Sequence, residues 1–520
     1  MRIVRRAATV VLLLGLITAV LAPAGCTTKK NPTNPTSSAP AQTLVVAQPA
    51  DAPTLDPQRA AGLIGMSVVI NMFDTLLTRG KDGNLEPGLA TDWKWLDNKT
   101  LQLKLRRGVK FHDGEPFNAE AVKFSYSEKR ITIPKTGLRM MALQAIKGAD
   151  IVDDYTVNII LSKPDPVLPA KMTLFGGLIV PPKYVQEKGD AYFGEHPVGT
   201  GPFKFVEWKK DDRVVMEANP DYWRGVPKIK QLVFKTIPND ADRVAALLSG
   251  EVQVISNLPP DAVDTVNKAQ GVRAVAVPGL RVQYVSLDTR KGPLAKKEVR
   301  QALNYAVDVG SIIKNVLGGM ADRVATLLPE EGFGYDPSIE PYPYDPERAR
   351  QLLAQAGYPR GFEVELDTNN GIYPKDKDVS QAIAGQLAQV GVKVNVKPFE
   401  SGTFSSLLTS GKIAPMYFIG NLAWSMDGSL NLQSFVKSDP INARMKNATL
   451  DKLVDVEETE VDPAKRQAAF SEIQRILKDG AYFIYLYQGK DIYGLSKNVV
   501  WDPPHNQVLW MYNASLNATQ

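Results

Sequence analysis

Histidine and cysteine, the residues most used for catalysis and for binding transition metals, are scarce in this sequence. The chain contains 3 His and 1 Cys among 520 residues. The histidines, at 112, 196 and 505, are far apart, and a single cysteine cannot form an intrachain disulfide or a Cys-based zinc or iron–sulfur site. We therefore expect no metal, no other cofactor and a function that does not depend on His or Cys chemistry.

Motifs for covalent or phosphate chemistry are equally weak. No Gly-x-Ser-x-Gly nucleophile elbow stands out. Gly199-Thr200-Gly201-Pro202 lacks the Lys of a phosphate-binding loop, and Pro202 removes a backbone N–H, so a structural turn is predicted. His112 follows a predicted strand in a turn, and we expect it to be solvated. No pair of carboxylates is singled out, so the sequence neither supports nor excludes glycoside hydrolysis.

The N-terminus has the pattern of an export signal. Arg2, Arg5 and Arg6 precede an uncharged apolar run from Ala7 to Ala22, which predicts a secretory signal peptide. The alternative is an uncleaved membrane anchor, but the run is shorter than the ~20 residues that a transmembrane helix needs.

Two cleavage sites are possible at the end of this signal. Ala22-Pro23-Ala24 fits an ordinary signal peptidase site. Ala24-Gly25-Cys26 resembles a bacterial lipobox, although Pro23 stands where that motif usually has Leu. Cys26 is the single cysteine and precedes a Pro-, Ser-, Thr- and Asn-rich stretch suited to a flexible tether. We therefore expect a signal peptide over 1–25, a lipidated Cys26 and a tether over 26–43.

The rest of the chain has the composition of an ordinary globular protein, with 44% hydrophobic and 22% charged residues. No run after Leu44 approaches transmembrane length. The formal net charge is +5, and removing the three signal-peptide arginines leaves about +2. So small a charge gives no reason to expect a nucleic-acid partner.

Strand and helix patterns alternate along the chain. Apolar alternation or short apolar runs predict strands at 44–48, 101–105, 157–161, 231–237, 252–256, 362–366 and 392–396. Helical patterns cover 241–249, capped by Asn239 or Asp240, a stretch capped by Asp345 that ends at Gly357, 378–390, and one long helix over 294–317. This order predicts an α/β fold with a mostly parallel sheet. The turn-rich stretch 85–190 is predicted to be a smaller inserted unit.

Seven segments carry a recognisable pattern, and they occur in order over nearly all of 44–510. They are 53–57, 86–126, 197–208, 219–234, 240–252, 298–308 and 344–359. Together they resemble one family, the oligopeptide/dipeptide/nickel-binding proteins (family 5) among the bacterial extracytoplasmic solute-binding proteins.

The resemblance implies a two-lobed, hinge-joined periplasmic-binding-protein-like fold of type II with an extra inserted domain. Ligand would lie between the lobes, and chain crossings near Val282–Asp288 and Leu486–Ile492 would form the hinge. The implied limits are 44–84, 191–280 and 486–520 for lobe I, 85–190 for the inserted domain, and 281–485 for lobe II.

The resemblance also implies a ligand-binding segment. Peptide-binding members use the Asp of a Trp-x-x-Asp segment to hold the ligand's amino terminus, which matches Trp424-Ser425-Met426-Asp427 here. The sequence departs from those members by continuing Gly428-Ser429-Leu430 instead of with Asp-Pro. Asp427 could alternatively cap a turn with Gly428. No His lies near this segment, which disfavours nickel, and Arg139 in the inserted unit is expected to be a solvated surface arginine.

The function implied is that of an extracytoplasmic receptor of an ABC importer that is not an enzyme. It would bind a peptide-like small solute and deliver it to ABC permease subunits in the membrane, as a monomer held by its N-terminal lipid, in the periplasm or on the outer face of the cytoplasmic membrane. Two alternatives stay open from the sequence: a secreted α/β hydrolase, and a sensing or chaperone-like binding protein on the same fold.

Overall fold

The structure is a computed structural model that describes residues 42–60, 62–80, 83–132, 138–438 and 444–517. The predicted signal peptide, Cys26 and the tether up to residue 41 lie outside the described residues. Within the described ranges, none of the helices combines the length and the apolar character that crossing a bilayer requires.

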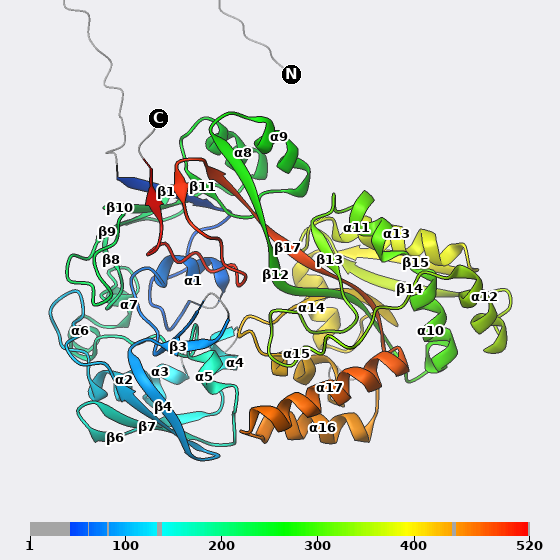
Figure 1. Cartoon of the computed structure of the whole chain (residues 1–520), viewed down its shortest axis with the longest axis horizontal. Helices are drawn as coiled ribbons and strands as arrows, with labels where there is room; N and C mark the ends of the chain where they lie inside the picture. Colours follow the sequence, from blue (N-terminus) through cyan, green and yellow to red (C-terminus); the bar gives the residue numbers. More distant parts are fainter. Residues whose placement is uncertain (1–41, 61, 81–82, 133–137, 439–443, 518–520) are drawn as a thin grey trace, which may run out of the picture. The chain divides into compact units, whose positions relative to one another are not determined.

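An eleven-stranded sheet organises most of these residues, and the α/β prediction is confirmed (Figure 1). Ten strands follow the order β15-β14-β16-β12-β17-β11-β1-β10-β9-β8, and β13 pairs with β17. Their bounds are β1 Thr43–Gln48, β8 Phe203–Lys209, β9 Arg213–Ala218, β10 Gln231–Thr236, β11 Val254–Ile255, β12 Val272–Leu287, β13 Ala321–Arg323, β14 Phe362–Asn369, β15 Val392–Phe399, β16 Met416–Leu422 and β17 Phe483–Ser496.

The sheet is mixed, which corrects the prediction that it would be mostly parallel. Parallel pairing is limited to β1 with β10 and β11, and to β14 with β15 and β16. Strand β12 pairs antiparallel with both β16 and β17, and β9 pairs antiparallel with β8 and β10. Helical crossovers enforce parallel pairing only between the strands that they join, so strands outside such units pair either way.

Capping residues set the starts of the crossover helices. Asn239 accepts hydrogen bonds from the backbone N–H groups of Ala241 and Asp242 at 2.9 and 3.2 Å and begins α8 (Asp240–Leu248). Asp345 accepts from Arg348 N at 2.8 Å at the start of α12 (Pro346–Gln355). Both caps match the sequence prediction.

The long helix predicted over 294–317 is wrong. The structure breaks it into α10 (Lys297–Ala306) and α11 (Val309–Asn315). Between them Val307 is extended, and the Asp308 side chain accepts from Ser311 N at 3.0 Å. A capping carboxylate inside an amphipathic pattern starts a second helix, because it satisfies N–H groups that a continuous helix would not leave free.

Strands β12 and β17 run side by side, and both are long (Figure 1). Val272–Pro278 of β12 pairs with residues 490–496 at the C-terminal end of β17. Val282–Ser286 pairs with residues 483–488 at its N-terminal end. The pairing register shifts between Pro278 and Val282. The predicted hinge segments fall on these two strands, beside the shift.

A separate antiparallel sheet of four strands, in the order β4-β5-β7-β6, lies within the stretch predicted to be the inserted unit. Its strands are β4 Ala90–Asp97, β5 Thr100–Leu105, β6 Ile146–Asp153 and β7 Thr156–Leu161, and α2 (Ala119–Ser125) contacts β6 and β7. Alternate residues of β5, including Leu101 and Leu103, are fully buried in a cluster of apolar side chains that extends to Met172 and Ile179.

The remaining elements are short strands and helices that complete the layers. The strands are β2 Leu77–Arg79 with β3 Leu85–Pro87, and β18 Val499–Val500 with β19 Ser515–Leu516. The helices are α1 Leu63–Val69, α3 Glu128–Ile131, α4 Leu138–Leu143, α5 Leu168–Lys171, α6 Pro182–Lys188, α7 Asp190–Phe193, α9 Val263–Lys268, α13 Asp376–Ala388, α14 Ser401–Thr409, α15 Ser429–Phe435, α16 Ala448–Thr459 and α17 Pro463–Gly480.

The Gly199–Pro202 segment forms a bend that packs against Met72, a structural role in line with the prediction. Gly201 N donates to Met72 O at 2.9 Å, and a Cβ on Gly199 would stand 2.0 Å from the same oxygen, so only glycine fits there. His112 corrects the prediction of a solvated residue. Its Nδ1 accepts from Gly199 N at 3.3 Å, and its Nε2 lies 3.0 Å from Gly201 O. The imidazole therefore contacts the backbone of the Gly199–Pro202 segment at two points.

Candidate ligand-binding site

A cavity with a volume of about 880 Å³, larger than a second one of about 530 Å³, lies where parallel strands end. Pro49 follows β1, and Asn257 follows β11. The Gly371–Lys375 segment follows β14 and leads into α13. Carboxyl ends of parallel strands are the usual place for ligands in open α/β sheets, and the volume is typical of small-molecule sites.

The floor of this cavity is built by the two long strands. On β17, Tyr487, Gly489 and Asp491 share one face because side chains alternate along a strand. From β12, Arg281 and Gln283 line the same cavity. The Arg281 guanidinium donates to Gly420 O at 3.2 Å and lies 5.4 Å from the centre of the Tyr373 ring, so it is held in place.

Asp491 is the most perturbed acid of the larger cavity. Its Oδ1 accepts from the Gln507 side chain at 2.5 Å, and its Oδ2 is shielded from solvent and has no hydrogen-bond partner among the described residues. Burial raises the pKa of the Asp491 carboxyl to about 7, against the Gln507 hydrogen bond and the positive charges of Arg281 and His505. The Tyr487 hydroxyl is also shielded from solvent, and no described residue forms a hydrogen bond with it.

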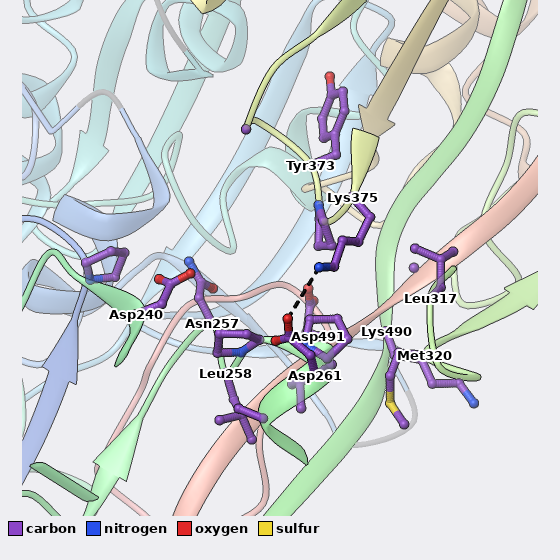
Figure 2. A pocket seen from close by; sticks show the side chains of 18 of the residues that line it. Asp240, Asn257, Leu258, Asp261, Leu317, Met320, Tyr373, Lys375, Lys490 and Asp491 are labelled. Carbon is purple, nitrogen blue, oxygen red and sulfur yellow. Dashed lines mark hydrogen bonds and ion pairs between the residues drawn. The ribbon is translucent and has the colours of Figure 1, made fainter. Parts of the chain in front are cut away.

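An ion pair spans the larger cavity. Lys375 Nζ lies 3.3 Å from Asp261 Oδ2, and Figure 2 shows the two side chains pointing toward one another. Lys375 directly precedes α13, whereas Asp261 belongs to the short helical turn Pro260–Ala262. The Lys375 and Asp261 side chains are 38% and 68% exposed, so solvent screens the pair and it contributes little to stability.

The predicted segment from Trp424 to Asp427 links β16 to α15. Met426 has a positive φ of 53°, and Met426 O accepts from Phe333 N at 3.0 Å. Gly428 N donates back to Phe333 O at 3.0 Å. These bonds fix the turn that presents Asp427.

Asp427 is buried and already paired. Its Oδ2 and Oδ1 lie 3.0 Å from Nη1 and Nη2 of Arg466, respectively. Its Oδ1 also accepts from Ser429 N at 3.0 Å, which is the capping role that the sequence left open. The predicted role of Asp427 as the partner of a ligand's ammonium therefore requires the ammonium to share this carboxylate with Arg466.

A second carboxylate, Glu457, stands beside this pair. Its Oε2 lies 3.5 Å from Arg466 Nη2, and its Oε1 accepts from Ser429 Oγ at 3.0 Å. Burial, and then the negative charge of Asp427, raise the pKa of Glu457 to about 8. Two carboxylates and one arginine thus share a space with little water.

Trp424 and Ser425 face protein. The Trp424 ring meets Phe175 edge to face, with centroids 5.2 Å apart. Arg79 donates to Ser425 O, while Ser425 Oγ is shielded from solvent and has no partner within the described part of the chain. Met426 and Asp427, by contrast, line the smaller cavity of about 530 Å³, together with Arg79 and Arg466. The four predicted residues are therefore contiguous, but none of them lines the larger cavity.

Arg139 corrects the expectation of a surface residue, because it is fully buried. Its Nη1 donates to Phe175 O, and its Nε and Nη2 have no hydrogen-bond partner among the residues that the structure describes. Burial lowers the pKa of this guanidinium to about 10. The pattern of charges along the chain does not indicate that Arg139 is buried, because its burial depends on packing against residues distant in the chain.

Sequence reasoning also missed the floor of the larger cavity. Tyr487 and Asp491 lie in a predicted chain crossing, and their spacing of four places both on one strand face. That spacing was the only indication in the sequence that the two side chains lie on the same side of the strand. Among the described residues, no group of three or more His, Cys, Asp or Glu is placed to hold a metal ion.

Comparison with known proteins gives consistent matches. The model of the family described as "Bacterial extracellular solute-binding proteins, family 5 Middle" matches residues 84–443. The glutathione-binding protein GsiB of Pectobacterium atrosepticum is 34% identical over 365 residues, which is 70% of each chain. GsiB of Salmonella typhimurium is 32% identical over 365 residues, again 70% of each chain.

Solved structures match over nearly the whole chain. HbpA2 from Haemophilus parasuis has a TM-score of 0.83 and 26% identity, and the match covers 92% of this chain and 100% of that one. The periplasmic binding protein DppA from Helicobacter pylori, in complex with the peptide STSA, has a TM-score of 0.74 and 27% identity, with 91% and 98% covered.

Proposed function

Because the chain belongs to the bacterial extracellular solute-binding proteins of family 5, we propose that it is the receptor of an ABC importer for a peptide-like solute. The solute would be held between the two lobes and passed to a membrane permease. The names of the relatives, which bind glutathione or peptides, support this class of solute.

The larger cavity is the observation that carries the proposal. It combines the strand ends after β1 and β11 with the segment after β14, over a floor formed by β12 and β17. A ligand in this place touches both groups of strands at once. Because such a ligand binds the closed arrangement more tightly than the open one, it shifts the population toward closure.

The test is to incubate the purified protein with a mixture of di- to tetrapeptides and to analyse the retained fraction by mass spectrometry. Recovery of unaltered peptides supports a receptor that is not an enzyme. Steady formation of cleaved products would instead favour a secreted hydrolase. Small-angle scattering with and without the retained peptides should show compaction on binding.

We also propose that Trp424, Ser425, Met426 and Asp427 contribute a wall of the ligand-binding region, with Asp427 facing an amino group. The support is the resemblance of this segment to peptide-binding members and the position of Met426 and Asp427 on the smaller cavity. The proposed limits of the lobes and of the inserted domain, 85–190, can be checked by limited proteolysis of the purified chain.

Anchoring and assembly complete the proposal. We infer that Cys26 carries the lipid that holds a monomeric receptor near its permease. Metabolic labelling with a radioactive fatty acid should mark the wild type and not Cys26→Ala. Equal labelling of both would remove Cys26 from this role, and the gene neighbourhood, with or without permease and ATPase genes, would separate import from sensing.

A further inference from the structure

The segment that links β16 to α15, together with the start of α15, sends two apolar side chains toward the other lobe. One apolar cluster draws its buried residues from 44–254 and 493–514, the stretches proposed as lobe I and the inserted domain. The exceptions are Trp424 and Leu430, which come from the stretch proposed as lobe II. These two residues are 2% and 3% exposed, so both side chains are removed from water by residues of the other lobe.

The Trp424 ring has a defined partner in this contact. It meets the Phe175 ring edge to face, with centroids 5.2 Å apart, and Phe175 is fully buried in the same cluster. Burying an aromatic ring and a leucine side chain gives a large favourable free energy, and the edge-to-face geometry adds to it. The free energy gained when this contact forms therefore comes from side chains of the protein itself.

Lobe II holds α15 in place through its other face. Asn431 Nδ2 donates to Leu327 O at 3.1 Å. Leu432 is buried in an apolar cluster whose buried residues all come from 282–485. Residues two apart on a helix point about 200° away from each other, so Leu430 packs on one lobe while Leu432 packs on the other. Because α15 is fixed to lobe II, Leu430 must leave its contact when the lobes separate.

A polar contact opposes part of this apolar gain. Arg79, in the stretch proposed as lobe I, donates to Ser425 O. The Arg79 Nε, however, is shielded from solvent and has no partner among the described residues. A buried donor without a partner costs free energy, and this cost is recovered when water reaches it. The contact between the lobes is therefore favourable and also reversible.

We propose that Leu430 and the Trp424 ring form a latch that holds the two lobes together and so raises the affinity for any solute enclosed between them. The effect on affinity rests on the proposed function. Leu430 lines neither cavity, so it would act without touching the solute. When a solute binds only the closed arrangement, its apparent affinity is proportional to the fraction of molecules that are closed. A weaker latch should therefore weaken the binding of every solute by a similar factor.

The experiment compares Leu430→Ala with Leu432→Ala. Both variants shorten a buried leucine of α15, but only Leu430 belongs to the contact between the lobes. Small-angle scattering is measured without added ligand, after dialysis from partly denaturing urea has removed any carried-over solute. Leu430→Ala should have a larger radius of gyration than wild type, and Leu432→Ala should not. Each di- to tetrapeptide that wild type retains should bind Leu430→Ala about 10-fold or more weakly.

The outcomes separate the latch from the proposed function. Leu430→Ala with the dimensions of wild type, or with an affinity no lower than that of Leu432→Ala, overturns the latch. A loss of affinity confined to one peptide also overturns it, because that result indicates direct contact. Phe175→Leu weakens the same contact from the other lobe and gives the same comparison if Leu430→Ala does not fold. The scattering uses no peptide, so it tests the latch even if wild type retains none, which would overturn the proposed function.

Discussion

Asp427 and Arg466 form a two-point ion pair, in which two carboxylate oxygens each lie 3.0 Å from a different guanidinium nitrogen. The pair joins the turn before α15 to α17, and the rings of Phe333 and Phe470 lie 4.9 and 5.4 Å from the guanidinium carbon. It holds the Trp424–Asp427 segment in its position.

Removing the cation of this pair should strongly destabilise the protein. Arg466→Met leaves Asp427 and Glu457 buried without their shared partner, and breaking a buried pair in this way costs about 3–5 kcal/mol. Urea unfolding measures the change. Lys393→Met, which breaks a pair with Glu363 whose side chains are 76% and 62% exposed, is the control and should unfold like wild type. Similar stability for both variants would contradict the structural role of Arg466.

Asp427→Ala tests the predicted contact with the ligand. If Asp427 holds an amino group, affinity for free-amine peptides should fall by about 10-fold or more, because a charge-assisted hydrogen bond is lost. Isothermal titration gives the affinity, and circular dichroism at the same temperature checks that the variant is folded. A folded variant with wild-type affinity would remove Asp427 from the binding surface.

Glu457 should make stability depend on pH in the neutral range. Its pKa is raised from 4.5 to about 8 in the folded protein, so the folded state binds the proton more tightly than the unfolded state. The stabilisation from this group is fully present below pH 4.5 and is lost as pH rises through about 8. Glu457→Gln should remove this fall in unfolding free energy, measured by urea titration across that range. If the unfolding free energies of wild type and Glu457→Gln depend on pH in the same way, the raised pKa of Glu457 is wrong.

His112 should make the free energy of unfolding depend on pH in the opposite direction to Glu457. Burial lowers the pKa of His112 from 6.5 to about 4, so the unfolded state takes up a proton that the folded state excludes. The stability linked to the neutral ring is present above pH 6.5 and is lost as pH falls toward 4. His112→Gln should flatten this part of the unfolding curve, even if its stability at neutral pH is lower. An unchanged slope would mean that the ring is solvated after all.

Substitution of alanine at two glycines should change the free energy of unfolding in opposite directions. A Cβ on Gly385, within α13, meets no atom within 4 Å, so Gly385→Ala should raise the free energy of unfolding by about 0.5–1 kcal/mol. A Cβ on Gly428 would stand 2.8 Å from both Leu328 methyl groups, so Gly428→Ala should destabilise the protein. Thermal unfolding of both variants gives the two signs, and a loss of stability in Gly385→Ala would contradict the open surroundings of that position.

The sequence alone determined many of the local elements of this protein, although not the break between α10 and α11. Alternating or buried apolar positions specified strands such as Thr43–Gln48 and Thr100–Leu105, because a strand must bury one face or both. Asn239 and Asp345 specified helix starts because their side chains satisfy nearby N–H groups. The family resemblance rests on the order of such segments and was confirmed by the match over residues 84–443.

The ion-pair partners and the burial of the charged side chains follow from the tertiary structure and not from local sequence patterns. Arg466 follows Asp427 by 39 positions, and Arg139 is buried by segments distant in the chain, so neither environment follows from local pattern. The pKa of Asp491 is raised because the pairing of β12 with β17 removes water from it. Propensity and capping act over a few residues, whereas desolvation and ion pairing depend on which distant segments the fold brings together.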